Sequence, residues 1–222
     1  QRSSLLPVFA EYRQALWEAG IPLDVRLGGE VHLHPDVFDM FAWGVLPMIG
    51  GLNGKKMMLL EFPDGAIPHG SDVACRMFAD QGVHWLIAHP ERNKAVMRNP
   101  DIIKPFVDMG CMLQLTAASV VGAFGRSAGQ MAHTLLTRGL AHVVASDAHN
   151  LAHRPPRMGE ARRYLSQHFG MGIAYRLTEE NPARILAERV AEPGEELPLA
   201  QPQQATPAAA PQGVIPQRMY AN

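Results

Sequence analysis

Three short apolar runs in this chain each end at a side chain that can bind a metal ion, and no other feature constrains the fold as much. The runs end at Glu61, at His89, and at the pair formed by Asp147 and His149. A short apolar run that stops at a polar or turn-forming residue is typical of a buried strand. In parallel α/β proteins the carboxyl ends of the strands converge on the same mouth. The repeated ending therefore predicts a parallel sheet with one shared cation site above it.

Each ending on its own has a simpler interpretation. A Glu or His after a buried strand is often only the start of a solvated loop. Asp147 and His149 are two residues apart, so on an extended segment both side chains would point to the same side. A carboxylate and an imidazole placed together are suitable ligands for a divalent metal ion. We interpret the endings as one site because the same arrangement recurs three times.

Helical and extended patterns alternate along most of the chain. Apolar residues with helical spacing begin at Leu5 and stop before Gly20, and another helix is expected to begin at Asn99 and Pro100. Strands are expected at residues 25–33, with Glu30 in the middle, and at 57–62, 85–88, 111–116 and 142–145. Further helices are expected at residues 71–82, 129–138, 156–169 and 182–190. Strand–helix alternation at this spacing implies right-handed crossovers and a parallel sheet.

Composition excludes several classes of protein. The 222 residues (24.3 kDa) suffice for one domain with a substantial core and a tail. No stretch of ~18 uncharged apolar residues is present, so a membrane span is not expected. The net charge of −1 argues against a dedicated nucleic-acid surface. The two cysteines, Cys75 and Cys111, are too few for a disulfide framework and are typical of a reducing compartment.

Residues 192–222 differ in composition from the rest of the chain. They are rich in Pro, Ala and Gln and contain almost no large apolar side chains. Such a segment cannot bury enough surface to offset the entropy that is lost on ordering. We therefore expect one folded domain over residues 1–191, followed by a disordered tail, and we favour a solvated tail over a partner-binding segment.

Several of these segments together resemble a known family. Glu-Phe-Pro at 61–63, Ala-His-Pro-Glu-Arg-Asn at 88–93 and Ala-Ser-Asp-Ala-His-Asn at 145–150 are similar to motifs of the bacterial PHP-domain tyrosine phosphatases of the CpsB/YwqE type. Residues 114–119 and 122–125 resemble the region between two of that family's strands. The resemblance covers most of the folded part, and the motifs in this order are quite specific.

The resemblance implies both a fold and an activity. The fold would be a distorted β/α barrel of the TIM-like PHP type, incomplete at its N-terminus in this chain. The activity would be that of a cytoplasmic hydrolase of capsule and exopolysaccharide biosynthesis, which cleaves phosphotyrosine by attack of a metal-activated hydroxide on phosphate. The expected cofactor is Mn²⁺, with Mg²⁺ or Fe as alternatives, and two or three ions in the complete family site. The expected partner is the phosphotyrosine tail of a bacterial tyrosine autokinase.

The resemblance also assigns roles to individual residues. Arg92, three residues after His89, is expected to bind phosphate oxygens with its planar fork of N–H donors. The implied metal ligands are Glu30, Glu61, His89, Asp147 and His149, and the implied catalytic residues are Arg92, His89 and Asp147. Cys111 lies in an apolar run, and no cysteine stands in a Cys-x5-Arg loop, so a cysteinyl-phosphate route is not expected.

The chain departs from the family pattern near its N-terminal end. Members of the family begin with a strand that carries a His-x-His pair, whereas residues 1–29 contain no histidine. The chain as given would hold only part of the expected ligands. A missing strand would leave its neighbour's edge unpaired, which favours self-association, so a homo-oligomer is among the expectations. Two other interpretations stay open: an inactive remnant that binds a phosphotyrosine partner, and a hydrolase of the same fold that acts on a small sugar phosphate.

Four more residues near these motifs have two interpretations each. His32 and His34 share a face with Glu30 on an extended segment, so they either add metal contacts or form a polar face beside the site. Arg154 and Arg157 follow the last motif, where they either help to bind an acidic phosphopeptide or begin a solvated helix.

Overall fold

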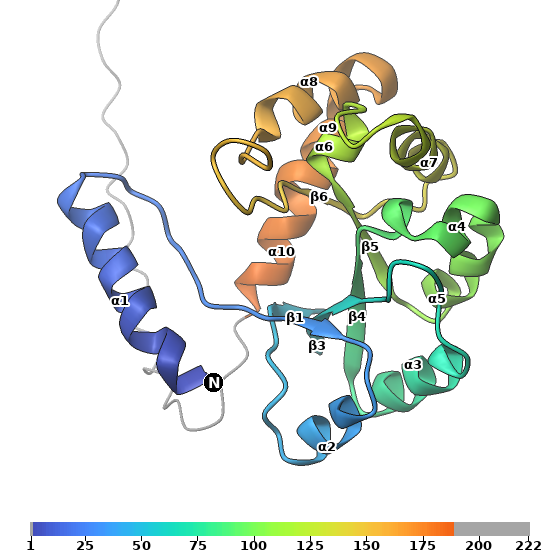
Figure 1. The fold of residues 1–222 in the computed structure, drawn as a ribbon, viewed down its shortest axis with the longest axis horizontal. Coiled ribbons are helices and arrows are strands. Elements are labelled where there is room, and N and C mark those ends of the chain that lie inside the picture. Colours follow the sequence, from blue (N-terminus) through green and yellow to red (C-terminus); the bar gives the residue numbers. More distant parts are fainter. Residues whose placement is uncertain (1, 189–222) are drawn as a thin grey trace, which may run out of the picture.

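The computed structural model describes residues 2–188, and a parallel sheet lies at its centre (Figure 1). The strands are β1 (Glu30–His32), β2 (Gly50–Leu52), β3 (Lys55–Glu61), β4 (Val83–Ala88), β5 (Met112–Thr116) and β6 (Val143–Ala145). β1, β3, β4, β5 and β6 lie side by side in this order, and each neighbouring pair is parallel. β2 pairs with β3 in the antiparallel direction. The prediction of an α/β fold with a parallel sheet is confirmed.

Most helices connect the parallel strands or lie against the sheet, and one further helix precedes the first strand (Figure 1). They are α1 (Arg2–Glu18), α2 (Asp36–Ala42), α3 (Ser71–Asp80), α4 (Lys94–Arg98), α5 (Lys104–Asp108), α6 (Ala117–Val120), α7 (Arg126–Thr137), α8 (Met158–Phe169), α9 (Met171–Tyr175) and α10 (Asn181–Ala187), with the short segments η1 (Pro90–Arg92), η2 (Pro100–Ile103) and η3 (Arg176–Glu180). Each connection between parallel strands contains at least one helix, as a crossover connection requires.

The two faces of the sheet bury different sets of side chains. The larger core packs the sheet against the surrounding helices, and it includes Met58, Leu60, Trp85, Ile87, Leu113 and Leu115. A smaller cluster on the other face consists of Met57, Leu86, Met112 and Val143, closed by Ile185 of α10. Side chains alternate between faces along a strand, so Glu61 lies on the same face as Met57. The smaller cluster therefore lies on the same face as Glu61, below the side chains at the carboxyl ends of the strands.

Most predicted elements are present, with shifted ends. The extended segment predicted over residues 25–33 forms a strand only at Glu30–His32, because only these three residues pair with β3. The helix predicted from residue 129 already begins at Arg126, directly after a Gly with a φ of 89°. The predicted tail, residues 192–222, lies outside the described residues.

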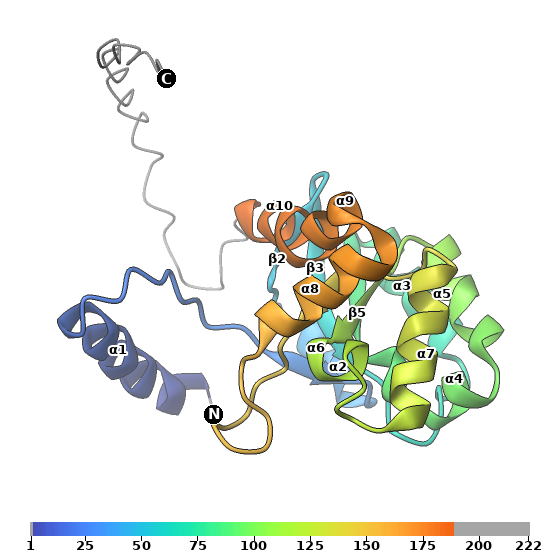
Figure 2. The same ribbon diagram turned by 90° about the horizontal axis from the view of Figure 1, so that it is seen from above.

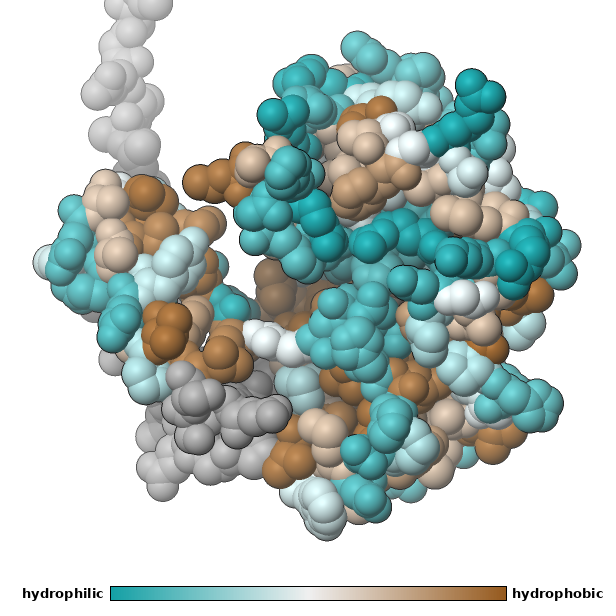
Figure 3. All heavy atoms as spheres, viewed as in Figure 1, coloured by the Kyte–Doolittle hydropathy of each residue, from teal (hydrophilic) through white to brown (hydrophobic). Residues whose placement is uncertain are grey.

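α1 stands apart from the rest of the molecule in both ribbon views (Figures 1 and 2). The helix forms where the sequence predicts it, but several of its large apolar side chains are exposed, among them Leu5, Leu6, Val8, Tyr12 and Trp17. Figure 3 shows hydrophobic side chains gathered over this helix. Helical spacing thus predicted the conformation of α1 but not burial of its apolar residues. Among residues 2–188, no helix combines the length and the apolar character needed to cross a membrane.

The two cysteines lie in the core. Cys75 of α3 and Cys111 before β5 are both buried, and their Sγ atoms lie 3.2 Å apart without a disulfide. The hydrogen bond to Cys75, together with burial, raises the pKa of the Cys111 thiol. The neutral thiol of Cys111 is therefore a poor nucleophile.

Candidate metal centre and arginine pocket

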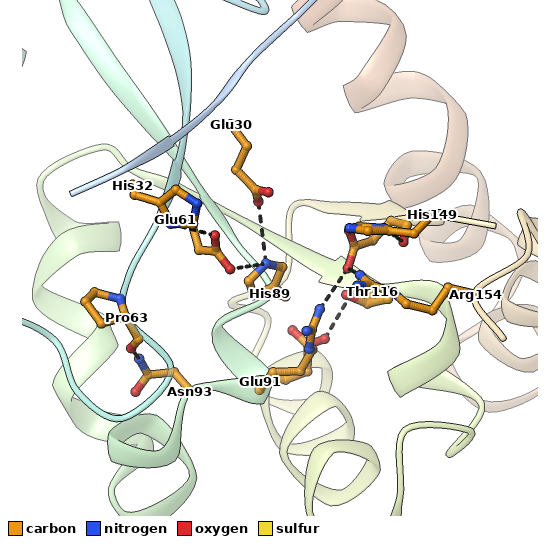
Figure 4. A network of polar contacts seen from close by, with 12 residues as sticks. Glu30, His32, Glu61, Pro63, His89, Glu91, Asn93, Thr116, His149 and Arg154 are labelled. Atoms are coloured by element: carbon orange, nitrogen blue, oxygen red, sulfur yellow. Dashed lines mark hydrogen bonds and ion pairs between the residues drawn. The ribbon is translucent and has the colours of Figure 1, made fainter. Parts of the chain in front are cut away.

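Glu30, Glu61 and His89 bring three potential ligand atoms together near the ends of β1, β3 and β4 (Figure 4). These atoms all lie within 4.8 Å of one another. Nε2 of His89 lies 3.1 Å from Oε1 of Glu61 and 3.5 Å from Oε1 of Glu30. In the pairing of β1 with β3, Glu30 lies opposite Leu59, two positions before Glu61 on the same face. Three of the five predicted metal ligands therefore form one cluster.

The charges of these three groups depend on one another. The hydrogen bond from His89 lowers the pKa of Glu30, against the opposing effect of partial burial. Burial by itself lowers the pKa of His89, but the hydrogen bond to Glu30 and the nearby charge of Glu61 outweigh it, so the pKa of His89 is raised above 6.5. A proton on Nε2 of His89 would lie between two carboxylates. A divalent cation binds carboxylates and neutral imidazole, so this proton must leave when a cation binds.

The backbone turns sharply at His89. Its φ of 34° lies in the left-handed region, which residues with a side chain rarely adopt. Pro90 follows and begins η1, where its missing N–H ends the pairing of β4. Asn93 secures the turn, because it caps α4 and its amide donates to the carbonyl oxygen of Pro63 at 2.9 Å. The turn is thereby held against the loop that follows Glu61, so His89 and Glu61 keep a fixed position relative to each other.

Glu91 lies beneath the site and is fully buried. Its Oε1 accepts a hydrogen bond from the backbone N–H of Thr116, at the end of β5, with a distance of 3.1 Å (Figure 4). Burial raises the pKa of Glu91, which favours the neutral carboxyl. The contact fastens η1, and with it Arg92, to the neighbouring strand. Sequence reasoning missed this residue, because no local pattern marks a Glu in a polar motif as buried.

Asp147 and His149 follow β6, but not on the extended segment that we predicted. Asp147 has a φ of 50°, so the alternation of side chains along a strand does not apply, and this prediction was wrong. The two residues nevertheless lie together, because Nδ1 of His149 is 3.0 Å from the carbonyl oxygen of Asp147. A carbonyl oxygen can only accept, so Nδ1 is the donor and Nε2 remains for another partner. His149 also lowers the pKa of Glu30, though less than His89 does.

Two arginines meet on the carboxylate of Asp147. Nη1 of Arg92 donates to Oδ2 of Asp147 at 2.8 Å, and Nη2 of Arg154 donates to the same oxygen. Asn150 lies in the loop between Asp147 and Arg154 and stabilises it, because its Oδ1 accepts a hydrogen bond from the backbone N–H of Arg154 at 3.1 Å. The structure thus brings the predicted Arg92 to Asp147. It also places Arg154, which had two interpretations, at the site.

A cavity of about 310 Å³ lies beside the two arginines, lined by Arg92, Met97, Phe124, Ala128 and Arg154. The ring centre of Phe124 lies 5.1 Å from Cζ of Arg92 and 5.6 Å from Cζ of Arg154. Both distances are within the range of a cation–π interaction. Sequence reasoning included Phe124 only within the segment 122–125, because nothing in that segment predicts a contact with two distant arginines.

The remaining candidates differ in where they lie. Nδ1 of His32 is 2.9 Å from Oε2 of Glu61, so this exposed imidazole borders the cluster. His34 instead faces the neighbouring Asp36, at 3.4 Å. Arg157 is exposed and lies 3.8 Å from a carboxylate in the first turn of α8, which supports its interpretation as part of a solvated helix start.

The fold and the site together define a class of protein. It is an α/β protein in which carboxylates and imidazoles suited to a hard divalent cation lie beside an arginine pair suited to phosphate. Comparison with known proteins identifies the family. Residues 2–187 match the family described as capsular polysaccharide synthesis, CpsB/CapC. The chain belongs to this family, and the resemblance seen in its motifs is confirmed.

Individual relatives agree with this assignment. The chain is 34% identical over 172 residues to the tyrosine-protein phosphatase YwqE of Bacillus subtilis, which covers 76% of this chain and 65% of that protein. It is 28% identical over 187 residues to the tyrosine-protein phosphatase CpsB of Streptococcus pneumoniae, covering 82% and 76% of the two chains. The chain thus spans about two thirds of the length of YwqE.

The fold has a counterpart among solved structures. It comes from crystal structures of YwqE from Bacillus subtilis and CpsB from Streptococcus pneumoniae, described as metal-dependent tyrosine phosphatases. The match has a TM-score of 0.74 at 31% sequence identity, and it covers 82% of this chain and 72% of the other. The arrangement of strands and helices described above is therefore that of the family.

Proposed function

We propose that this chain is a metal-dependent phosphomonoester hydrolase, and specifically a protein-tyrosine phosphatase. The observation that carries the proposal is the cluster of Glu30, Glu61 and His89 beside an Asp147 that binds two arginines. Such a site offers ligands for a cation and donors for a phosphate at the same end of the sheet. The relatives with this fold are tyrosine-protein phosphatases, which supports phosphotyrosine as the substrate.

The donor set fits a hard divalent ion. The proposed metal ligands are Glu30, Glu61, His89, Asp147 and His149. They offer carboxylate oxygens and imidazole nitrogens and no thiolate, which suits Mn²⁺, with Mg²⁺ or Fe as alternatives, better than a structural zinc. Two or three such ions, when bound, would lower the pKa of water and offset the negative charge of the phosphate.

The chain's own residues hold the substrate and the ligands in place. Arg92 and Arg154 each present several N–H donors, and we assign both to the phosphate oxygens of the substrate. Asp147 accepts from both guanidinium groups and so orients them toward one point. His89 must give up its proton to act as a ligand, and the turn at Pro90 keeps its ring aimed at Glu61 while it does so.

We further propose the setting of this activity. The parallel strands, the surrounding helices and the smaller cluster closed by α10 support part of a distorted β/α barrel of the PHP type, within a domain over residues 1–191. Membership of a capsular polysaccharide synthesis family supports a role in that pathway. The proposed partner is the phosphotyrosine tail of a bacterial tyrosine autokinase in the cytoplasm.

The test is phosphate release by the Mn²⁺-loaded protein from a phosphotyrosine peptide and from a sugar phosphate. Release from the peptide alone is the expected result, and His89→Ala and Asp147→Ala should each abolish it. His133→Ala is a matched control, because His133 is exposed on α7 and contacts Phe169 rather than the site. Wild-type rates in both His89→Ala and Asp147→Ala would place the active site elsewhere.

The same experiment separates the alternatives. Release from the sugar phosphate alone would favour a small-molecule phosphatase of the same fold. Binding of the phosphotyrosine peptide without release from either substrate would favour an inactive binding protein. If the protein neither binds the peptide nor releases phosphate from either substrate, all three interpretations are contradicted.

A further inference from the structure

We propose that Phe124 is a positioning residue, whose ring holds Arg92 and Arg154 in place as a two-arginine clamp for phosphate. The inference rests on the proposed function, since the clamp is useful only if a phosphate binds there. It concerns a residue that lies outside the cation cluster and donates no hydrogen bond from its side chain.

The two guanidinium groups come from different parts of the fold and share two neighbours. Arg92 belongs to η1, and Arg154 lies in the loop after β6. Both donate to Oδ2 of Asp147, and both lie near the ring of Phe124, at 5.1 and 5.6 Å. One carboxylate therefore binds both side chains, and one ring supports both.

Two positive groups at one carboxylate repel each other, and Asp147 carries only one negative charge. The negative face of an aromatic ring attracts a cation without adding a formal charge, so Phe124 reduces this imbalance. The Nε atom of Arg154 is buried and has no hydrogen-bond partner within the described part of the chain. The direction of that guanidinium therefore depends on Asp147 and on the ring. If Asp147 also binds a cation, its carboxylate has a second partner, whereas the ring of Phe124 still contacts the same two arginines.

The turn that carries Phe124 is itself well held. Phe124 lies between α6 and α7, and the glycines on either side, Gly122 and Gly125, have φ values of 78° and 89°. The N–H of Ala123 donates to the carbonyl of Ala118 at 2.8 Å, which fastens the turn to α6. A Cβ at Gly129 of α7 would come within 3.3 Å of the Cα of Gly122, so α7 packs closely against this turn. A ring on such a turn has little freedom to follow the arginines, and so it can position them.

A second explanation of the ring must be separated from this one. Phe124 lines the 310 Å³ cavity with Met97 and Ala128, so its ring could instead contact the aromatic part of a substrate. Inorganic phosphate has no aromatic part and distinguishes the two roles. A ring that positions arginines affects the binding of phosphate itself, whereas a ring that contacts the substrate affects only the aryl ester.

The experiment compares Phe124→Leu and Phe124→Trp with the wild type, and it uses Phe38→Leu on α2 as the matched control, because Phe38 packs against Phe78 and not against the arginines. Affinity for inorganic phosphate is measured by calorimetry on the Mn²⁺-loaded protein, together with KM and kcat for a phosphotyrosine peptide and the Mn²⁺ content. Phe124→Leu should weaken phosphate binding by roughly 5- to 30-fold, as expected for the loss of one or two cation–π contacts. The KM should rise by a similar factor, with Mn²⁺ content unchanged. Phe124→Trp should restore wild-type affinity, because it keeps an aromatic face.

Each outcome decides the question. Unchanged phosphate affinity in Phe124→Leu would overturn the proposal, whether or not the aryl ester binds more weakly. Equal losses in Phe124→Leu and Phe124→Trp would also overturn it, because a general packing role would then explain the data. In a protein that binds phosphate but hydrolyses no ester, weaker phosphate binding by Phe124→Leu alone would support the clamp while the proposed function fails. If the wild type binds no inorganic phosphate, the clamp proposal is wrong, whereas the proposed function is still decided by phosphate release from the peptide.

Discussion

Replacing Glu91 tests whether a buried neutral carboxyl holds the site together. Glu91→Ala removes the acceptor of the Thr116 N–H, which is buried at the end of β5. An unpaired buried N–H costs about 1–3 kcal/mol, and the lost burial of the side chain adds about 0.8 kcal/mol for each methylene. The expected loss of stability is therefore about 3 kcal/mol. For a domain of this size, that corresponds to a fall in Tm of roughly 6–12 °C.

Glu91→Gln should behave differently. The amide oxygen can still accept from Thr116, and the amide nitrogen takes the place of the protonated oxygen, so we expect a loss below about 1 kcal/mol near neutral pH. Burial raises the folded-state pKa of Glu91 above its ordinary value of 4.5. The stability that this carboxyl contributes is then present below 4.5 and is lost as pH rises through the folded-state pKa. The stability of Glu91→Gln relative to the wild type should therefore improve as pH rises.

The assay is urea and thermal unfolding in the presence of a chelator, so that bound cations do not contribute to stability. Glu160 of α8 is exposed and serves as the control, and both its Ala and Gln variants should change stability by less than about 0.5 kcal/mol. Equal losses in Glu91→Ala and Glu91→Gln would refute the reasoning, because the neutral acceptor would then have no role. A change in Tm below about 2 °C in Glu91→Ala would refute the assigned burial of the contact.

Four further predictions follow from particular contacts. Glu61→Gln should weaken Mn²⁺ binding by about 100-fold or more, and a calorimetric loss below about tenfold would remove Glu61 from the ligand set. Because the pKa of His89 is raised above 6.5 and a cation must displace its proton, Mn²⁺ affinity should increase as pH rises through and beyond 6.5, and pH-independent binding would contradict this. Burial lowers the folded-state pKa of His142, so its contribution to stability is present above 6.5 and is lost as pH falls; urea unfolding should show a weaker acid dependence in His142→Gln. A mild oxidant should join Cys75 to Cys111, whose Sγ atoms are 3.2 Å apart, and raise the Tm, whereas Cys75→Ser should show no such increase.

The parts of the site that the sequence predicted are those that depend on strand ends. Glu61 ends β3 and His89 follows β4, and parallel pairing of these strands brings both residues to the same mouth. The apolar runs mark the strands, and alternation along the chain marks the crossovers, so the position of each ligand follows from local patterns. Glu30 was assigned by the family resemblance instead, and the structure places it at the start of β1, on the same face as Glu61.

The parts that it did not predict depend on contacts between distant residues. Glu91 and Phe124 acquire their roles from partners far away in the sequence, and no periodicity records such a pairing. Arg154 had two interpretations, and its contact with Phe124 is of the same kind. α1 shows the opposite case, since helical spacing predicts an apolar stripe but not what covers it. A local sequence pattern thus indicates the conformation of a segment and which of its sides is apolar. The residues that each side chain contacts depend on the assembled fold.

The backbone conformation of Asp147 connects the cation cluster with the two arginines. Its left-handed φ of 50° ends the extended course of β6, and a residue with a side chain holds such a conformation only where neighbouring contacts stabilise it. Here those contacts come from Arg92 and Arg154 on Oδ2. Oδ1 is the other oxygen of the carboxylate, 3.7 Å from Nδ1 of His149. One carboxylate can therefore bind the arginines through Oδ2 and a cation through Oδ1, which would place a phosphate held by the arginines next to that cation. A glycine at position 147 would relieve the backbone strain, but it would also remove the carboxylate that binds the arginines. The strained conformation is therefore retained because it allows this contact.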